Sequence, residues 1–81
     1  MQNIVVGTEE AYLVTVTVND RPIRLPFTCG DASVLMALAG VPAQHSFFQH
    51  RLAGHKLLRR DETLMFRDGD AFFSLPPQHS D

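Results

Sequence analysis

One short helix signal most constrains what this 81-residue chain can fold into. In the stretch Thr28–Pro42, Thr28 is placed as an N-cap, and Asp31 follows three residues later in a variant of the capping box. Good helix formers occupy Ala32–Ala39, and Gly40 stands where a left-handed residue is favoured after a helix. A helix this short is marginal alone, so it needs an apolar surface to lie on. We expect the face that it buries to consist of Val34, Leu35 and Leu38.

The segment before the helix reads as a β-hairpin that supplies part of this surface. Ala11–Val18 alternates between apolar and polar residues with a period of two, which is a strong strand signal. Asn19-Asp20-Arg21-Pro22 has the composition of a turn. Ile23–Phe27 alternates again and predicts a second strand, and Pro26 places that strand at a sheet edge because proline lacks a backbone N–H.

The segment after the helix reads as further strands. We expect a third strand at Phe47–Leu52, a short fourth strand at Lys56–Leu58 and a final strand at Asp70–Leu75, which is central in the sheet if it inserts beside the first. Thr63–Phe66 reads as a helical turn or irregular segment, with Leu64 or Phe66 facing inward. This order predicts an α+β fold, in which one helix packs across one face of a mixed four- to five-stranded sheet.

Composition and sequence patterns bound the class of protein. The net charge of −2 argues against a nucleic-acid-binding protein, which is usually basic. A single cysteine excludes an intramolecular disulfide framework, and no apolar run is long enough to span a bilayer. No secretory signal pattern stands at the N-terminus. We therefore expect a cytoplasmic protein that binds neither nucleic acid nor membrane, with a flexible leader at residues 1–10.

No group of residues in the sequence has the pattern of an active site, so we expect neither an enzyme nor a cofactor. Cys29 lacks a CxxC partner and an adjacent base, which predicts a half-buried structural residue. The five-residue spacing of three histidines is unlike that of zinc motifs, so surface or edge positions are expected for His45, His50 and His55. The acidic pairs are interpreted as turn and solubility residues: Asp61 with Glu62, and Asp68 with Asp70.

The order of the expected elements resembles the ubiquitin-like β-grasp fold, over about residues 12–77. Leu52-Ala53-Gly54-His55-Lys56-Leu57 is similar to the ubiquitin segment Phe-Ala-Gly-Lys-Gln-Leu, and Asp61-Glu62-Thr63-Leu64 is similar to its Asp-Gly-Arg-Thr-Leu. Three further stretches resemble a bacterial branch, the multiubiquitin-type domain: Val18–Pro22, Leu38–Pro42 and Phe72–Pro76. The resemblance implies a β-grasp domain at residues 11–76 and a C-terminal tail at residues 77–81.

The resemblance implies that the protein is a modifier that becomes attached to other proteins. The implied partners are an activating enzyme, a conjugating enzyme, a processing protease or isopeptidase, and a target protein. A C-terminal carboxylate is adenylated, passed to a thiol or hydroxyl, and joined to a target amine. The residues of the conjugation tail are Pro76, Pro77, Gln78, His79, Ser80 and Asp81.

The tail departs from the ubiquitin pattern, because such modifiers usually end in Gly-Gly and here no glycine follows Gly69. Three explanations stay open: a protease trims the tail, the cognate enzyme accepts another terminus, or the protein is never conjugated. The alternatives are a β-grasp module that binds partners noncovalently through the edge of strand two, and, with less support, a sulfur carrier, which also needs Gly-Gly.

The resemblance also places a recognition surface on the sheet. Arg51, flanked by His50, occupies the relevant position on strand three, and the last strand supplies the apolar part through Phe72 or Phe73, whichever faces outward. Arg51 and Phe72 are the leading candidates. A basic cluster lies in sequence around the third and fourth strands, and it reads either as a solvated face or as a patch for an acidic enzyme surface: Arg51, Lys56, Arg59 and Arg60.

Overall fold

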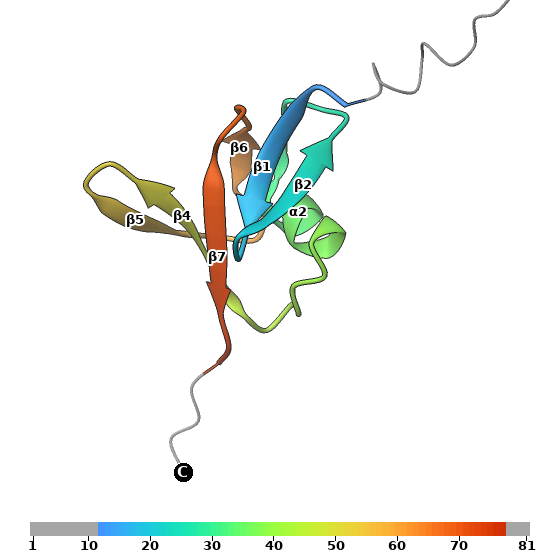
Figure 1. Cartoon of the computed structure of the whole chain (residues 1–81). Helices are drawn as coiled ribbons and strands as arrows, with labels where there is room; N and C mark the ends of the chain where they lie inside the picture. The colour runs from blue at the N-terminus through green and yellow to red at the C-terminus, as the bar shows by residue number, and fades with distance from the viewer. Residues whose placement is uncertain (1–11, 78–81) are drawn as a thin grey trace, which may run out of the picture.

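Seven strands and one helix make up residues 12–77, the part of the chain that the computed structural model describes (Figure 1). The expected leader at residues 1–10 and residues 78–81 of the expected tail lie outside the described residues. In chain order the elements are β1 (Val14–Val18), β2 (Arg21–Leu25), β3 (Cys29–Asp31), α2 (Ala32–Leu38), β4 (Ser46–Arg51), β5 (Gly54–Leu58), β6 (Thr63–Met65) and β7 (Ala71–Leu75).

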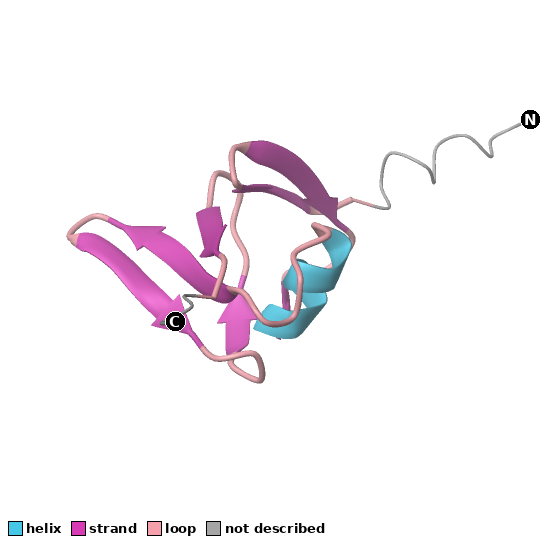
Figure 2. Cartoon of the chain, turned by 90° about the horizontal axis from the view of Figure 1, so that it is seen from below, coloured by secondary structure: helices cyan, strands magenta, loops and turns pink. Residues whose placement is uncertain are grey.

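Five of these strands form a mixed sheet in the order β2-β1-β7-β4-β5 (Figure 1). β7 lies at its centre, where it pairs in parallel with β1 through Thr17 opposite Ala71 and Val18 opposite Phe72, and antiparallel with β4. α2 packs across one face of the sheet, beside its β1–β2 half, while β4 and β5 extend away from the helix (Figure 2). The predicted α+β architecture is confirmed, as are the central last strand and the edge position of β2, and the fold is compatible with a β-grasp.

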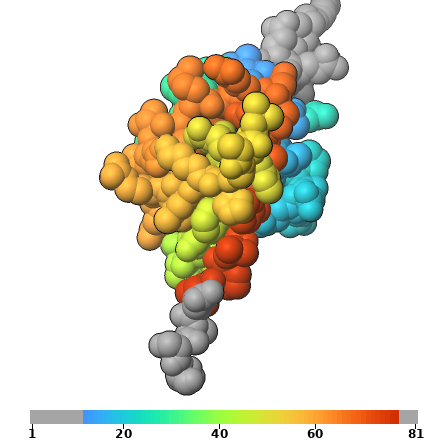
Figure 3. All heavy atoms as spheres, turned by 90° about the vertical axis from the view of Figure 1, so that its left-hand side faces the viewer, coloured from blue at the N-terminus to red at the C-terminus, as the bar shows by residue number. Residues whose placement is uncertain are grey.

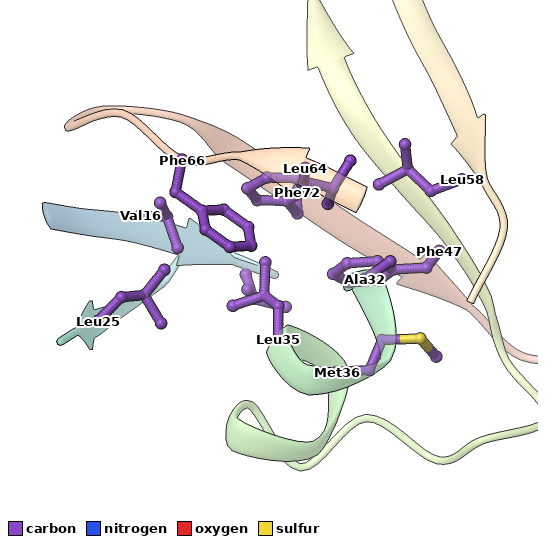
Figure 4. Packing of buried hydrophobic residues seen from close by; sticks show 11 residues of the cluster. Val16, Leu25, Ala32, Leu35, Met36, Phe47, Leu58, Leu64, Phe66 and Phe72 are labelled. Atoms are coloured by element: carbon purple, nitrogen blue, oxygen red, sulfur yellow. The ribbon is translucent and has the colours of Figure 1, made fainter. Parts of the chain in front are cut away.

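The core lies between α2 and the inner face of the sheet. Leu35 projects from the helix towards Val16 and Phe66 (Figure 4). The rings of Phe47 and Phe72 stack at a centroid distance of 5.6 Å, which contributes about 0.5–1.5 kcal/mol beyond the burial of their area. The buried side chains come from both layers: Val16, Val18, Leu25, Ala32, Leu35, Met36, Phe47, Leu58, Leu64, Phe66 and Phe72.

The buried face of α2 differs from the predicted one. Leu35 is fully buried, but Val34 is 40% exposed and Leu38 is 52% exposed. The helix instead buries Ala32, Leu35 and Met36, which follow the helical spacing i, i+3, i+4. Two overlapping apolar stripes run along this helix, and its sequence does not show which of them meets the sheet.

The start of α2 also differs from the prediction, because Thr28 is not its N-cap. Asp31 occupies that position and its side chain makes no capping hydrogen bond. The free N–H groups of the first turn are satisfied from another part of the chain: Ala32 N–H donates to the carbonyl of Glu62 and Ser33 N–H to that of Arg60, each at 2.9 Å. Backbone carbonyls therefore replace the side-chain cap that the sequence suggested.

A second, two-stranded sheet was not foreseen. The prediction of a helical turn or irregular segment at Thr63–Phe66 is wrong, because Thr63–Met65 forms β6 and pairs antiparallel with β3. Leu64 and Phe66 are both buried. Strands of three residues carry too little alternation to be recognised from sequence.

The turn between β1 and β2 is tighter than predicted. Asn19 and Asp20 have φ angles of 54° and 68°, as in the two-residue hairpin loops whose twist matches that of the flanking strands. Arg21 and Pro22 already belong to β2. Asn19 also fixes this turn to β7: its Oδ1 accepts from the backbone N–H of Ser74 at 2.9 Å, and its Nδ2 donates to Ser74 Oγ at 3.0 Å.

The two stripes of α2 give a matched pair of stability variants. Leu35→Ala is expected to lower the free energy of unfolding by about 2–5 kcal/mol, because it leaves a cavity in the core. Leu38→Ala makes the same chemical change at an exposed site, and we expect a change of about 0.5 kcal/mol or less. Urea unfolding followed by circular dichroism measures both values, and equal losses would contradict the observed orientation of the helix.

The β1–β2 turn gives a second pair. Asn19→Gly removes both side-chain hydrogen bonds to Ser74, and we expect unfolding to require about 1–2 kcal/mol less. Asp20→Gly keeps these bonds and relieves a positive φ, so its stability should be unchanged or slightly raised. Thermal unfolding of both variants and of the parent chain measures these stabilities. A larger loss of stability for Asp20→Gly than for Asn19→Gly would contradict the role of the Asn19 side chain.

Candidate functional site

The alternation of strands β4, β5 and β7 sorts their side chains onto two faces. Phe48 lies opposite Leu57 of β5 and Phe73 of β7, and His50 lies opposite His55. Side chains of directly opposed residues share one face of a sheet. These five residues therefore project from the face opposite to α2, because their neighbours Phe47, Leu58 and Phe72 point into the core.

We call Phe48, His50, His55, Leu57 and Phe73 the outer patch. Phe73 is at its centre and packs against three other rings. Its ring stacks on Phe48 at a centroid distance of 4.9 Å, lies 4.7 Å from the ring of His50, and meets His55 edge-on at 5.3 Å. The four rings hold one another in place, so the patch is a preformed surface.

The outer patch is open to solvent. Leu57 is 58% exposed and Leu75, which follows on the same face of β7, is 48% exposed. His50 and His55 are exposed, Phe48 and Phe73 are half-buried, and no helix or strand among residues 12–77 covers this face. A contiguous apolar surface rimmed by polar groups is typical of a protein–protein interaction site.

Phe72 is not part of this surface, which corrects its selection as a recognition residue. Its side chain is 1% exposed and stacks on Phe47 inside the core. Phe73 takes the outward position of the Phe-Phe pair. The sequence left this choice open, and it is settled by the register of β7 against β4, in which Phe73 lies opposite Phe48.

The basic residues lie on the other face, so the expected mixed surface of His50 and Arg51 is wrong. Arg51 follows His50 in β4 and points to the helix side, where its Nε and Nη2 donate to Gln49 Oε1 at 3.3 and 3.0 Å. Lys56 lies opposite Gln49 and forms an ion pair with Glu62, with an N–O distance of 2.6 Å. Strand alternation separates the apolar and the basic elements.

Arg59 and Arg60 lie in the loop after β5. Arg59 Nε is 3.5 Å from Asp61 Oδ1, and both side chains are at least 80% exposed, so this ion pair adds little stability. Arg60 lines a small hollow beside Met36 and Val41 of the helix region. The high exposure of Arg59 fits the interpretation as part of a solvated face.

A larger hollow of about 580 Å³ opens on the helix side of the β4–β5 hairpin. Figure 3 views the molecule from this end, with the yellow and light-orange atoms of the hairpin nearest the viewer. On the inner face of the hairpin, Phe47 and Leu58 are buried in the core, whereas Gln49, Arg51 and Lys56 line the hollow. Its lining includes Gln49, Arg51, Lys56, Glu62, Met65 and Arg67.

The Glu62 carboxyl, in the loop after β5, has a lowered pKa, and the cause is its contacts. The hydrogen bond from Lys56, followed by one from the backbone N–H of Arg59 at 3.2 Å, holds the pKa of the Glu62 carboxyl below its ordinary value of 4.5. Its side chain is 22% exposed. The Glu62 carboxylate thus fixes the loop after β5 against the side chain of Lys56.

The other residue types considered in the sequence for catalysis or metal binding do not come together into a site among residues 12–77. Cys29 is exposed in β3, which corrects the expectation of a half-buried residue. Within residues 12–77, no three side chains of the ligand types are grouped so as to hold a metal ion. Asp68 and Asp70 are turn residues, as predicted. Asp68 Oδ1 accepts from Thr15 N–H at 2.7 Å, and Asp70 Oδ2 accepts from Arg67 N–H at 3.0 Å.

Sequence reasoning did not assign Phe48, His55 and Leu57 to a recognition surface, although it expected His55 at the surface or at an edge; these three residues complete the outer patch. A signal for them was present. Phe48 and His50 alternate with the core residue Phe47, and His55 and Leu57 alternate with the core residue Leu58. Each set contains one apolar residue per strand, so the alternation groups these residues on one face but does not show which face is buried.

Comparisons with known proteins found no match: no protein-family model, curated protein or solved structure matches the chain. Among residues 12–77, no helix is both long and apolar enough to cross a membrane. The case for function therefore depends on the geometry of the two faces of the hairpin.

The Glu62 carboxyl predicts how stability depends on pH. Since the folded carboxyl binds its proton more weakly than the unfolded one, the contact stabilises the fold at neutral pH and is lost as the pH falls through the lowered pKa. Glu62→Gln should therefore make the free energy of unfolding less dependent on pH below about 4.5. Asp20→Asn is the control at an exposed turn position. Parallel acid profiles for Glu62→Gln and the parent chain would contradict the contact.

Proposed function

We propose that this protein is a bacterial ubiquitin-like modifier, recognised through the outer patch and attached to targets through the segment that follows β7. One observation supports this proposal above the others. The central strand β7 carries Phe73, the centre of the patch, and leads directly into the exposed residues Pro76 and Pro77. A partner seated on the patch is thereby held beside the segment on which it acts.

The chemistry of the patch suits recognition by enzymes. Aromatic side chains dominate binding energy in many interfaces, because each buries a large area at a small cost in conformational entropy. The Phe73 ring is already fixed by its three neighbours, so little freedom is lost when a partner covers it. His50 and His55 supply hydrogen-bonding groups at the rim.

In this proposal a cytoplasmic activating enzyme uses ATP to convert the C-terminal carboxylate into an acyl adenylate, releasing pyrophosphate. A thiol or hydroxyl then displaces AMP, a conjugating enzyme carries the acyl group, and a target lysine amine displaces that carrier to form an amide. A protease or isopeptidase trims the tail or removes the modifier. Pro76 and Pro77 hold the start of the tail extended, away from the sheet.

A second candidate function is a module that binds partners noncovalently. The outer patch supports it, because ring stacking and exposure there do not involve the tail. The patch is a better binding route than the edge strand β2 suggested by the sequence. Pro22 lies within β2 and cannot donate a backbone hydrogen bond to an added strand. No observation favours the sulfur carrier.

Conjugation is tested with the full chain, co-expressed with an adenylating and a conjugating enzyme encoded beside it. Mass spectrometry of digested lysates is expected to find lysines that carry residues of the tail. Leu57→Asp, an exposed change in the outer patch, should lower the yield of conjugates about ten-fold or more. Leu13→Asp is the control. Leu13 is 57% exposed and Leu57 is 58% exposed, and Leu13 directly precedes β1, a strand that contributes no residue to the outer patch.

The outcomes separate the two functions. Absence of both conjugates and a trimmed terminus, with both enzymes active, overturns the modifier. In that case, capture of the same enzymes by the unconjugated chain is measured as well. If the parent chain captures them and Leu57→Asp does not, the result supports the noncovalent binding module. Equal losses for Leu13→Asp and Leu57→Asp would remove the outer patch from either function.

A further inference from the structure

The hollow on the helix side of the β4–β5 hairpin has the chemistry of a second binding site. We propose that it binds an acidic peptide segment, with side-chain carboxylates on Arg51 and Arg67 and an apolar side chain against Met65. This inference does not rest on the proposed function, because Arg51, Met65 and Arg67 lie outside the outer patch, with which the hollow shares only His50.

The two arginines of the hollow are available to a ligand. Neither Arg51 nor Arg67 forms an ion pair with any carboxylate among residues 12–77. Two of the five N–H donors of Arg51 are used by Gln49 Oε1, which leaves three donors and fixes the plane of the guanidinium. A guanidinium that is already oriented binds a carboxylate through paired hydrogen bonds with little loss of entropy.

The acidic groups of the hollow are already occupied, and they limit the type of ligand. Glu62 is paired with Lys56, and Asp70 accepts from the backbone of Arg67. Their negative charges repel a polyanion such as nucleic acid, whose phosphates follow one another closely along the strand. A peptide spaces its carboxylates with uncharged residues, so it can place them on the arginines and avoid Glu62 and Asp70.

The apolar rim adds a second element of recognition. Met65 is 68% exposed and Leu52, at the tip of the hairpin, is fully exposed, and both border the hollow. Methionine is common at surfaces that adapt to different apolar side chains. Cations beside an apolar rim fit a segment in which acidic and apolar residues alternate, and a volume of about 580 Å³ is adequate for a few residues of such a segment.

Binding is tested with a short fluorescein-labelled peptide of alternating glutamate and leucine, and with a matched peptide in which glutamine replaces every glutamate. Fluorescence anisotropy with the full chain should show saturable binding of the acidic peptide, weaker at higher salt, and none of the neutral one. Backbone amides of β4, β5 and β6 around the hollow should shift in NMR spectra, while those of β2 stay in place.

Variants assign the binding to the hollow. Arg51→Gln and Arg67→Gln are each expected to weaken the acidic peptide about ten-fold, the loss of one charge-assisted contact. Arg24→Gln is the control, because it makes the same change of charge at an exposed position of β2, at the sheet edge far from the hollow. It should alter binding by less than about two-fold. Circular dichroism confirms that each variant is folded.

Three results would overturn the proposal. The first is no saturable binding of the acidic peptide. The second is an equal loss for Arg24→Gln and Arg51→Gln, which shows attraction to charge in general. The third is displacement of the peptide by inorganic phosphate with shifts of the same amides, which shows a site for simple anions.

Discussion

The parallel pairing of β1 with β7 is the contact on which the rest of the structure depends. It joins strands from opposite ends of the described chain through Thr17 opposite Ala71 and Val18 opposite Phe72. It unites the β1–β2 hairpin with the β4–β5 hairpin in one sheet, because β7 also pairs with β4. Only that continuous sheet is wide enough to bury Leu35 of α2 on one side and expose the outer patch on the other.

The sequence was informative where structure is local. The alternation in β1, the turn at Asn19-Asp20 and Gly40 after α2, with a φ of 73°, all follow from short-range preferences. It failed where partners come from afar. The N-terminus of α2 is capped by carbonyls of Arg60 and Glu62, and β3 exists only because it pairs with β6. Nothing near Thr28 in the chain reveals these contacts.

The candidate sites show the same division. The sequence pointed to the hairpin that carries both candidate sites, through His50 and Arg51, but not to the faces on which these residues lie. A period of two sends neighbours in a strand to opposite sides, so the mixed surface that the resemblance implied is divided into an apolar patch and a hollow lined by arginines. Phe72 and Phe73 are separated by the same rule, and the register with Phe48 decides which is buried.

The central position of β7 has a consequence for when the protein can be recognised. Phe73 belongs to β7, the last strand of the described residues, and it packs against rings from β4 and β5. Its docking requires closure of the chain between β4 and β7, because Phe73 lies opposite Phe48 in the sheet. A chain in which β7 has not docked therefore does not display the assembled surface. Under the proposed function, recognition by a partner would require a completed sheet.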